Sequence, residues 1–360
     1  MGTSDQKNVT PVSDDAQSVV TRNYNAITTG RQPRGRVLTL LVDQHVILVL
    51  VIFLLTIVFS AINPVFFTLN AAGNIFVQWA PIVLIATGEL FVIISGGIDL
   101  SVGSTLTISS VIAALAMAGL TREHWPEVPT LIVGTIVALL VGAVIGGINA
   151  FLINIVKLVP FVATLATLGV GAGVALVVTG GGPIAGGPPS AISLSAPTLL
   201  GGLASWPVLV VVAILIIAGL FLHKARFGKY TYAIGGNPFA ATAAGISVKK
   251  HLSKVYVLSG LFAGAAGMIL YLQLGSGSPS AGTSDELAAI AAVVIGGASL
   301  AGGFGTLWGA VLGALILEIV YSGLTIINID PNWNQVAVAI LIAAAASLQA
   351  IRTLRRGRKA

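Results

Sequence analysis

Five polar residues fall inside or beside long apolar runs, where polar side chains are costly and therefore informative. Gln78 and Glu89 are eleven residues apart in one run, so they share nearly the same face of a continuous helix. Asp99 and Ser101 come just after a Gly-Gly break that follows this run, and Glu318 lies in the middle of a later one. Such groups could line a water-filled path for a hydroxyl-rich solute.

The same residues also allow a purely structural interpretation. Glu89 and Glu318 could hydrogen-bond to a neighbouring helix or to freed backbone amides. A carboxylate at position 99, between a Gly-Gly turn and Leu-Ser, could cap the following helix through its amides. Both interpretations stay open at this stage.

The sequence carries no pattern for covalent or metal chemistry. It contains no cysteine, and its four histidines are scattered at positions 45, 124, 223 and 251. His-Glu-x-x-His, Gly-x-Ser-x-Gly and the phosphate-binding Gly-x-x-x-x-Gly-Lys-Ser/Thr are all absent. We therefore expect no catalytic residue, no metal ligand and no cofactor on this chain.

Composition decides the broad class. Only 8% of the 360 residues are charged and 56% are hydrophobic, whereas soluble domains carry about 25% charged residues. This excludes a soluble enzyme, a disordered protein and a nucleic-acid-binding domain. What remains is an all-α, polytopic transmembrane helical bundle embedded in the lipid bilayer.

Apolar windows predict about ten spans within a membrane domain at 46–351, each near the ~20 residues that cross a bilayer. A polar tail at 1–45, expected to be disordered and cytoplasmic, precedes it, and a basic cytoplasmic tail at 352–360 follows. The windows are 46–62, 72–95, 101–120, 130–156, 161–179, 207–222, 255–274, 287–300, 305–328 and 334–351. The window at 287–300 is short and Gly-rich, so its residues do not fix where this span begins and ends.

Positive charges predict the orientation, because lysine and arginine concentrate in cytoplasmic loops. With an inside amino terminus and ten crossings, all of the 18 lysines and arginines except Arg122 fall on the inner side. Both termini are then cytoplasmic. The largest inner segment, 223–254, contains Asn237 as a plausible N-cap, Pro238 as a first helical residue and Gly245 as a stop. This short helix is either an ordinary loop helix or a docking element for a soluble partner.

A Gly-rich motif occurs twice. Gly-Gly-x-(Asp/Ser)-Leu-(Ser/Ala)-x-Gly is found at 96–103 and again at 296–303, each time between two spans. Paired Gly-interrupted segments in the two halves of a membrane protein indicate a transport pathway. Small residues four apart, such as Gly142 and Gly146 or Gly260 and Gly264, indicate close helix packing instead.

Three motifs in this order resemble the ribose/xylose-type permease subunits of bacterial ABC sugar importers, in the branched-chain amino acid/ribose permease superfamily. The similarity covers about residues 45–350. The motifs are Gly96-Gly97-Ile98-Asp99-Leu100-Ser101-Val102-Gly103, Tyr232-Ala233-Ile234-Gly235-Gly236-Asn237-Pro238, and Glu286-Leu287 followed by 289–297.

The resemblance implies a subunit of the bacterial inner membrane that works by alternating access and translocates a monosaccharide or similar hydroxylated solute. ATP and Mg²⁺ would act on a separate ABC ATPase. An extracytoplasmic sugar-binding protein and a second permease copy would complete the importer, with no nucleic-acid partner. Contacts with the ATPase would come from Gly236, Asn237, Pro238, Phe239, Ala241, Gly245 and Ile246. Phe239 and Thr242 replace an acid and an arginine usual in the family, which favours an apolar contact.

A second class remains open on the residues alone. A self-sufficient secondary transporter could use Glu89 or Glu318 as a proton or cation site, and the broken-helix repeat would suit it equally well.

Overall fold

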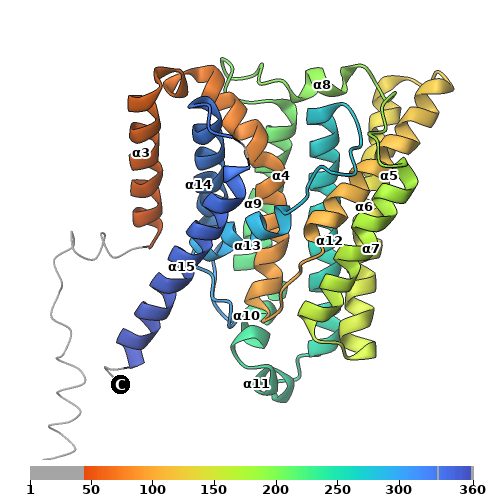
Figure 1. The fold of residues 1–360 in the computed structure, drawn as a ribbon. Helices are drawn as coiled ribbons and strands as arrows, with labels where there is room; N and C mark the ends of the chain where they lie inside the picture. Colours follow the sequence, from red (N-terminus) through yellow and green to blue (C-terminus); the bar gives the residue numbers. More distant parts are fainter. Residues whose placement is uncertain (1–43, 331, 358–360) are drawn as a thin grey trace, which may run out of the picture.

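The computed structural model describes residues 44–330 and 332–357, and these form a helical bundle without named strands (Figure 1). The expected tail at 1–45 lies outside the described residues except for Gln44 and His45, which begin the first helix. The elements are α3 (Gln44–Ile62), η1 (Pro64–Phe67), α4 (Leu69–Ile94), α5 (Val102–Arg122), α6 (Glu127–Phe151), η2 (Leu152–Val156), α7 (Pro160–Thr179), α8 (Ser190–Ser195), α9 (Trp206–His223), α10 (Arg226–Gly236), α11 (Pro238–Ala243), α12 (Val248–Leu274), α13 (Asp285–Ile295), α14 (Leu307–Ile326) and α15 (Trp333–Gly357).

Eight of the described helices are long and apolar enough to cross a membrane, and the polytopic all-α prediction is confirmed. The remaining two expected spans correspond to α13 and α15. In α15 the backbone stays helical through Gly357, but the apolar part covers only Trp333–Ala344. The start of the expected tail at 352–360 therefore continues this helix, and its last three residues lie outside the described chain.

The prediction of a full span at 287–300 differs from the structure. Helix α13 has 11 residues, which at 1.5 Å per residue is about 16 Å, half of a bilayer core. Figure 1 shows α13 at mid-height, below a non-helical stretch that descends from the upper end of α12. This stretch and α13 together occupy the place where the sequence predicted one helical span, because Gly296–Gly297 end the helix and the preceding Gly-rich 275–284 does not continue α12. Hydropathy alone cannot distinguish such a divided span from a helix.

Helix α4 forms the centre of the bundle and packs against α9, α12, α13 and α14. Its Pro81 and most residues from Ala80 to Ile94 are buried. Helix α12 in turn packs closely on α6 at the expected small residues. A methyl group on Gly142 would lie 2.1 Å from the carbonyl oxygen of Gly260, so the two backbones touch there. By contrast, a methyl group on Gly169 or Gly173 of α7 would meet no atom of the described part of the chain within 4 Å.

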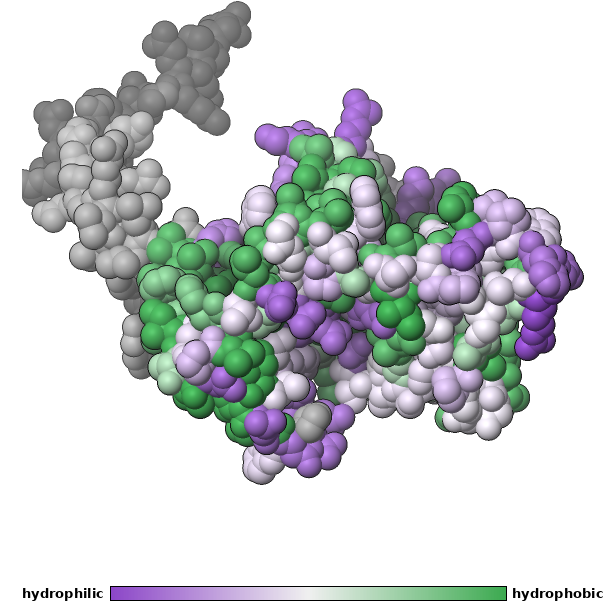
Figure 2. Space-filling view, turned by 90° about the horizontal axis from the view of Figure 1, so that it is seen from above, coloured by the Kyte–Doolittle hydropathy of each residue, from purple (hydrophilic) through white to green (hydrophobic). Residues whose placement is uncertain are grey.

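The outer faces of the bundle are apolar. Large side chains such as Phe53, Ile132 and Ile217 are more than half exposed, as expected for helices that face lipid tails. Figure 2, seen from the end that carries α8, shows a strip of hydrophilic residues between apolar groups across the middle of this face. The bundle therefore presents polar groups at its end and apolar groups around its sides.

Candidate functional site

A buried polar cluster lies where α4 ends and α5 begins. The Glu89 carboxylate of α4 accepts the backbone N–H of Asp99, with oxygen–nitrogen distances of 3.2 and 3.3 Å. Both side chains are enclosed, with exposed fractions of 0% and 1%. The chain can fold back in this way because Gly96, at φ +87, adopts a left-handed conformation that glycine readily takes. Glu89 thus holds the Gly-Gly break against its own helix.

A hydrogen-bond network around the Asp99 carboxylate joins four elements, α5, α6, α7 and α12. One oxygen accepts the Ser101 N–H at 3.0 Å and the Ser101 hydroxyl at 2.6 Å, at the start of α5. The other oxygen accepts the hydroxyl of Ser259 from α12 at 3.0 Å. Asn149 of α6 donates to the Ser101 oxygen at 2.8 Å and accepts from Thr167 of α7 at 2.6 Å. The cluster therefore ties the first Gly-rich break to α6, α7 and α12.

The residues that the sequence predicts along the solute path lie in different surroundings. Gln78 is exposed, whereas Glu89 on the same helix is fully buried, so the two do not share a cavity surface. Glu318 is 3% exposed and accepts the Ser322 hydroxyl at 2.9 Å. The structure brings Glu89, Asp99 and Ser101 together and leaves Gln78 and Glu318 apart from them.

Sequence reasoning missed the partners of this cluster. Asn149, Thr167 and Ser259 are fully or nearly fully buried polar residues inside apolar runs. The same signal that singled out Glu89 could have identified Asn149, because a buried amide in a membrane helix needs partners. Thr167 and Ser259 carry a weaker signal, since hydroxyl side chains often bond to their own helix.

The helix expected at 237–246 is present as α11. The Asn237 side chain caps it by accepting the N–H of Ala240 at 3.0 Å, and Pro238 is its first residue. Gly245, at φ +83, ends the turn as expected. Phe239 is 87% exposed, which leaves a large apolar side chain in water at one end of the molecule.

Among the other expected docking residues, Ala241 is buried while Gly236 and Gly245 are exposed. Ile246 is partly buried, and its N–H donates to the carbonyl of Ala241 at 3.0 Å. The exposed surface of α11 is therefore centred on Phe239.

Helix α10 connects α11 to both Gly-rich breaks. A methyl group on Gly235 would lie 1.7 Å from the Ile94 carbonyl oxygen and 2.6 Å from the Gly303 nitrogen. The Gly303 N–H itself donates to Ile94 at 2.8 Å, and the Tyr232 hydroxyl donates to the Gly305 carbonyl at 2.6 Å. The two copies of the repeat also touch, because a methyl group on Gly302 would lie 3.0 Å from the Cα of Gly96. We call this contact of α10 with both breaks the glycine junction.

Burial raises the pKa of the Tyr232 hydroxyl to about 12. The phenol therefore keeps its proton, and remains a donor to Gly305, throughout the physiological pH range.

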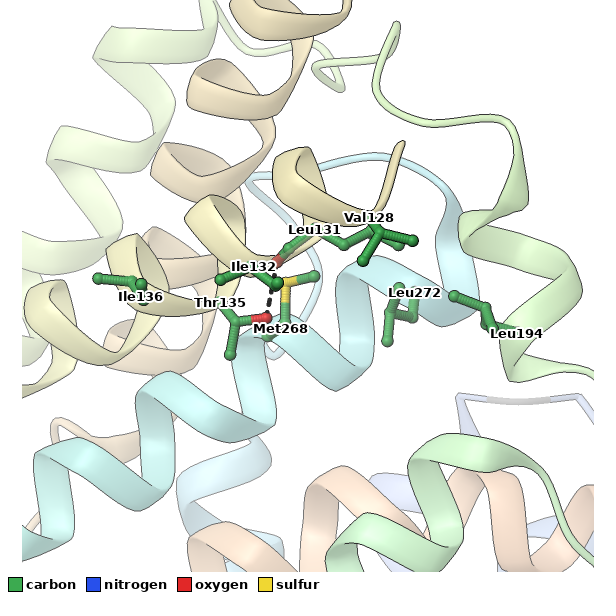
Figure 3. Close-up of a pocket in the computed structure, with 8 residues that line it drawn as sticks. All are labelled: Val128, Leu131, Ile132, Thr135, Ile136, Leu194, Met268 and Leu272. Carbon is green, nitrogen blue, oxygen red and sulfur yellow. Dashed lines mark hydrogen bonds between the residues drawn. The ribbon is translucent and has the colours of Figure 1, made fainter. Parts of the chain in front are cut away.

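Two grooves between the helices are apolar. One, of about 300 Å³, lies between α6, α8 and α12, and Figure 3 shows Val128, Leu131, Ile132 and Met268 around it. Its Thr135 hydroxyl is already bonded to the Leu131 carbonyl of the same helix, at 2.8 Å. A second groove of about 280 Å³ shares several of these residues and extends to α9. Neither offers the free polar groups that would bind a hydroxylated solute.

A polytopic bundle with a capped helix projecting from one end, joined to both of its interrupted segments, is the architecture of a transport subunit. A family model described as the branched-chain amino acid transport system / permease component matches residues 71–346. The chain belongs to this permease family, as its motifs indicated. Membership supports an importer subunit over a self-sufficient secondary transporter.

Curated relatives cover most of the chain. The ribose import permease protein of Bacillus subtilis (strain 168) is 40% identical over 81% of this chain and 88% of its own length. The D-allose transport system permease protein of Escherichia coli (strain K12) is 35% identical over 81% and 87%. The galactose/methyl galactoside import permease protein of the same strain is 33% identical over 89% and 97%. No solved structure matches.

Proposed function

We propose that this chain is the membrane-spanning subunit of a binding-protein-dependent ABC importer and translocates a monosaccharide or a closely similar hydroxylated solute. The observation that carries this proposal is the glycine junction, through which α10 links the exposed helix α11 to both Gly-rich breaks, in a chain similar to ribose, allose and galactose permeases. ATP and Mg²⁺ act on the partner ATPase. A sugar-binding protein delivers the solute at the opposite face, and a second copy of this chain completes the pathway.

The geometry suggests how movement of the ATPase reaches the membrane. Phe239 and its neighbours on α11 bind the ATPase. Helix α10 moves with α11, because only Asn237 separates the two helices. At the glycine junction α10 contacts the end of α4 and the connection between α13 and α14, so one displacement acts on both halves of the bundle. Glu89, Asp99 and Ser101 contribute to the path by holding the start of α5, and Gln78 contributes from the exposed side of α4.

We also infer a bacterial inner-membrane location with α11 and both termini in the cytoplasm. The basic residues support this orientation, because 223–254 contains six lysines and arginines while Arg122 lies at the far end of α5. Helix α11 and the described carboxyl end lie at the same end of the bundle, opposite α8 (Figure 1).

Single cysteines in this cysteine-free chain test the orientation and the docking surface together. Thr242 on α11 and Glu123 after α5 are both exposed. A membrane-impermeant maleimide is expected to label Thr242→Cys only in inside-out vesicles and Glu123→Cys only in intact cells. The bound ATPase is expected to slow labelling of Thr242→Cys at least tenfold.

Adding Phe239→Ala to Thr242→Cys is expected to remove most of this protection. Burial of a phenylalanine is worth roughly 1.5–3 kcal/mol, which corresponds to about a ten- to hundredfold change in affinity. Labelling of Thr242→Cys in intact cells would overturn the orientation. Equal labelling with and without the ATPase would overturn the docking surface.

A further inference from the structure

One cavity differs in chemistry from the apolar grooves. It has a volume of about 280 Å³ and lies between the start of α13, the outer half of α14 and the start of α15. Its polar lining comes from Thr283, Ser284, Asp285, Tyr321, Asn334 and Gln335. Val338 and Ile342 of α15 complete the wall with apolar surface. Hydroxyl, carboxylate, amide and phenol groups are thus brought to one concave surface.

The interrupted segment made of the non-helical stretch 275–284 and helix α13 creates this cavity. The non-helical stretch before α13 ends at Ser284, which has φ +72, and the helix starts at the next residue. Because α13 begins only at mid-height of the bundle (Figure 1), its first turn is placed among membrane helices and not at a membrane surface. A continuous helix across this region would fill the space that Thr283 and Asp285 now line.

One polar group of the cavity lining lacks a hydrogen-bond partner within the described part of the chain. The side-chain oxygen of Asn334 is buried, and no hydrogen-bond partner for it is found among residues 44–330 and 332–357. Buried polar groups are normally paired, so an acceptor of this kind calls for an explanation. On α14, the buried Glu318 carboxylate accepts the Ser322 hydroxyl at 2.9 Å. Glu318 lies one turn from Tyr321 on the same helix and does not itself line the cavity.

These groups match a small sugar. Carboxylate and amide oxygens accept hydrogen bonds from hydroxyls, amide nitrogens donate to them, and the Tyr321 side chain offers an apolar ring with a polar tip. Pockets for small molecules commonly measure about 300–1,000 Å³, so a cavity of about 280 Å³ suits a single sugar ring rather than an oligosaccharide.

We propose that this cavity is a binding site for a single hydroxylated ring during its passage through the membrane, with Asp285, Asn334 and Gln335 as the hydrogen-bonding groups. The proposal rests on the proposed sugar-import function. It places a solute site inside one permease chain, at the divided span.

The test uses the complete importer, reconstituted with its ATPase and binding protein, and measures uptake of D-ribose, D-allose and D-galactose. Asp285→Asn is expected to lower uptake of the transported sugar at least tenfold, while ATP hydrolysis stimulated by the loaded binding protein stays within twofold. Asp330→Asn is the matched control, because Asp330 is exposed between α14 and α15 and does not line the cavity. It is expected to leave both activities unchanged.

A second measurement, the rate at which introduced cysteines are modified, is informative even if Asp285→Asn does not fold. Thr283→Cys lines the cavity, and Ser280→Cys lies three residues away on exposed chain. A saturating concentration of the transported sugar is expected to slow modification of Thr283→Cys at least fivefold and to leave Ser280→Cys unaffected. Normal uptake by Asp285→Asn, or equal modification rates with and without sugar, would overturn the cavity as a binding site. Absence of sugar uptake by the unaltered importer would overturn the proposed function as well.

Discussion

Gly235→Ala is expected to abolish coupled sugar uptake while the ATPase stays bound. The added methyl group would lie 1.7 Å from the Ile94 carbonyl oxygen, so α10 would have to move away from the end of α4. This separates the docking helix from both Gly-rich breaks but leaves the exposed surface of α11 unchanged. In reconstituted vesicles we expect uptake to fall at least tenfold with ATP hydrolysis retained.

The neighbouring residue is the control. A methyl group on Gly236 would meet no described residue within 4 Å, so Gly236→Ala makes the same chemical change without the collision. Because Gly236 is also an expected docking residue, uptake by the two variants is compared at equal amounts of bound ATPase. Tyr232→Phe supplies a milder test at the same place, because it removes only the 2.6 Å hydrogen bond to Gly305. Its several-fold loss of uptake should not vary between pH 6 and 9, since Tyr232 has a pKa of about 12. Equal uptake by Gly235→Ala and Gly236→Ala would contradict the role of the junction.

Asp99→Ala is expected to reduce the amount of folded protein sharply. It removes the acceptor for the Ser101 N–H and hydroxyl and for the Ser259 hydroxyl, all of them buried. Leaving buried donors unpaired costs about 1–3 kcal/mol each, and partial rearrangement of the hydroxyls makes about 2–5 kcal/mol a reasonable total. Membrane abundance and the midpoint of thermal unfolding in detergent measure the effect.

Asp99→Asn should be much milder, because the amide oxygen still accepts from Ser101 and the amide nitrogen can donate to the oxygen of Ser259. Glu123→Ala is the surface control, because Glu123 is exposed after α5, and we expect its stability to change by less than about 0.5 kcal/mol. Unaltered abundance and melting of Asp99→Ala would show that the buried cluster does not hold the bundle together.

Local signals explain what the sequence could predict. Asn237, Pro238 and Gly245 set the ends of α11 within a few residues of one another, so their pattern is readable without knowledge of the fold. The small residues at Gly142 and Gly260 likewise indicated a close approach that the structure contains. The exposed Phe239 followed from the polarity of its segment.

The sequence did not show how deeply each polar residue is buried or which distant residues it bonds to. The helical period places Gln78 and Glu89 on one face, but it does not say that one end of that face is covered by other helices. Asp99 and Ser259 are 160 residues apart and meet only because α12 packs against α4 and α5. The window at 287–300 is short and Gly-rich, but its apolar residues do not show that the helix is only Asp285–Ile295.

The most direct test of the importer function is transport by purified components in vesicles. The chain is combined with its ATPase, its sugar-binding protein and ATP, and uptake of D-ribose, D-allose and D-galactose is measured as each component is omitted. We expect uptake of at least one of these sugars only when all components are present. Uptake by the chain alone, driven by a proton or sodium gradient, would contradict the account.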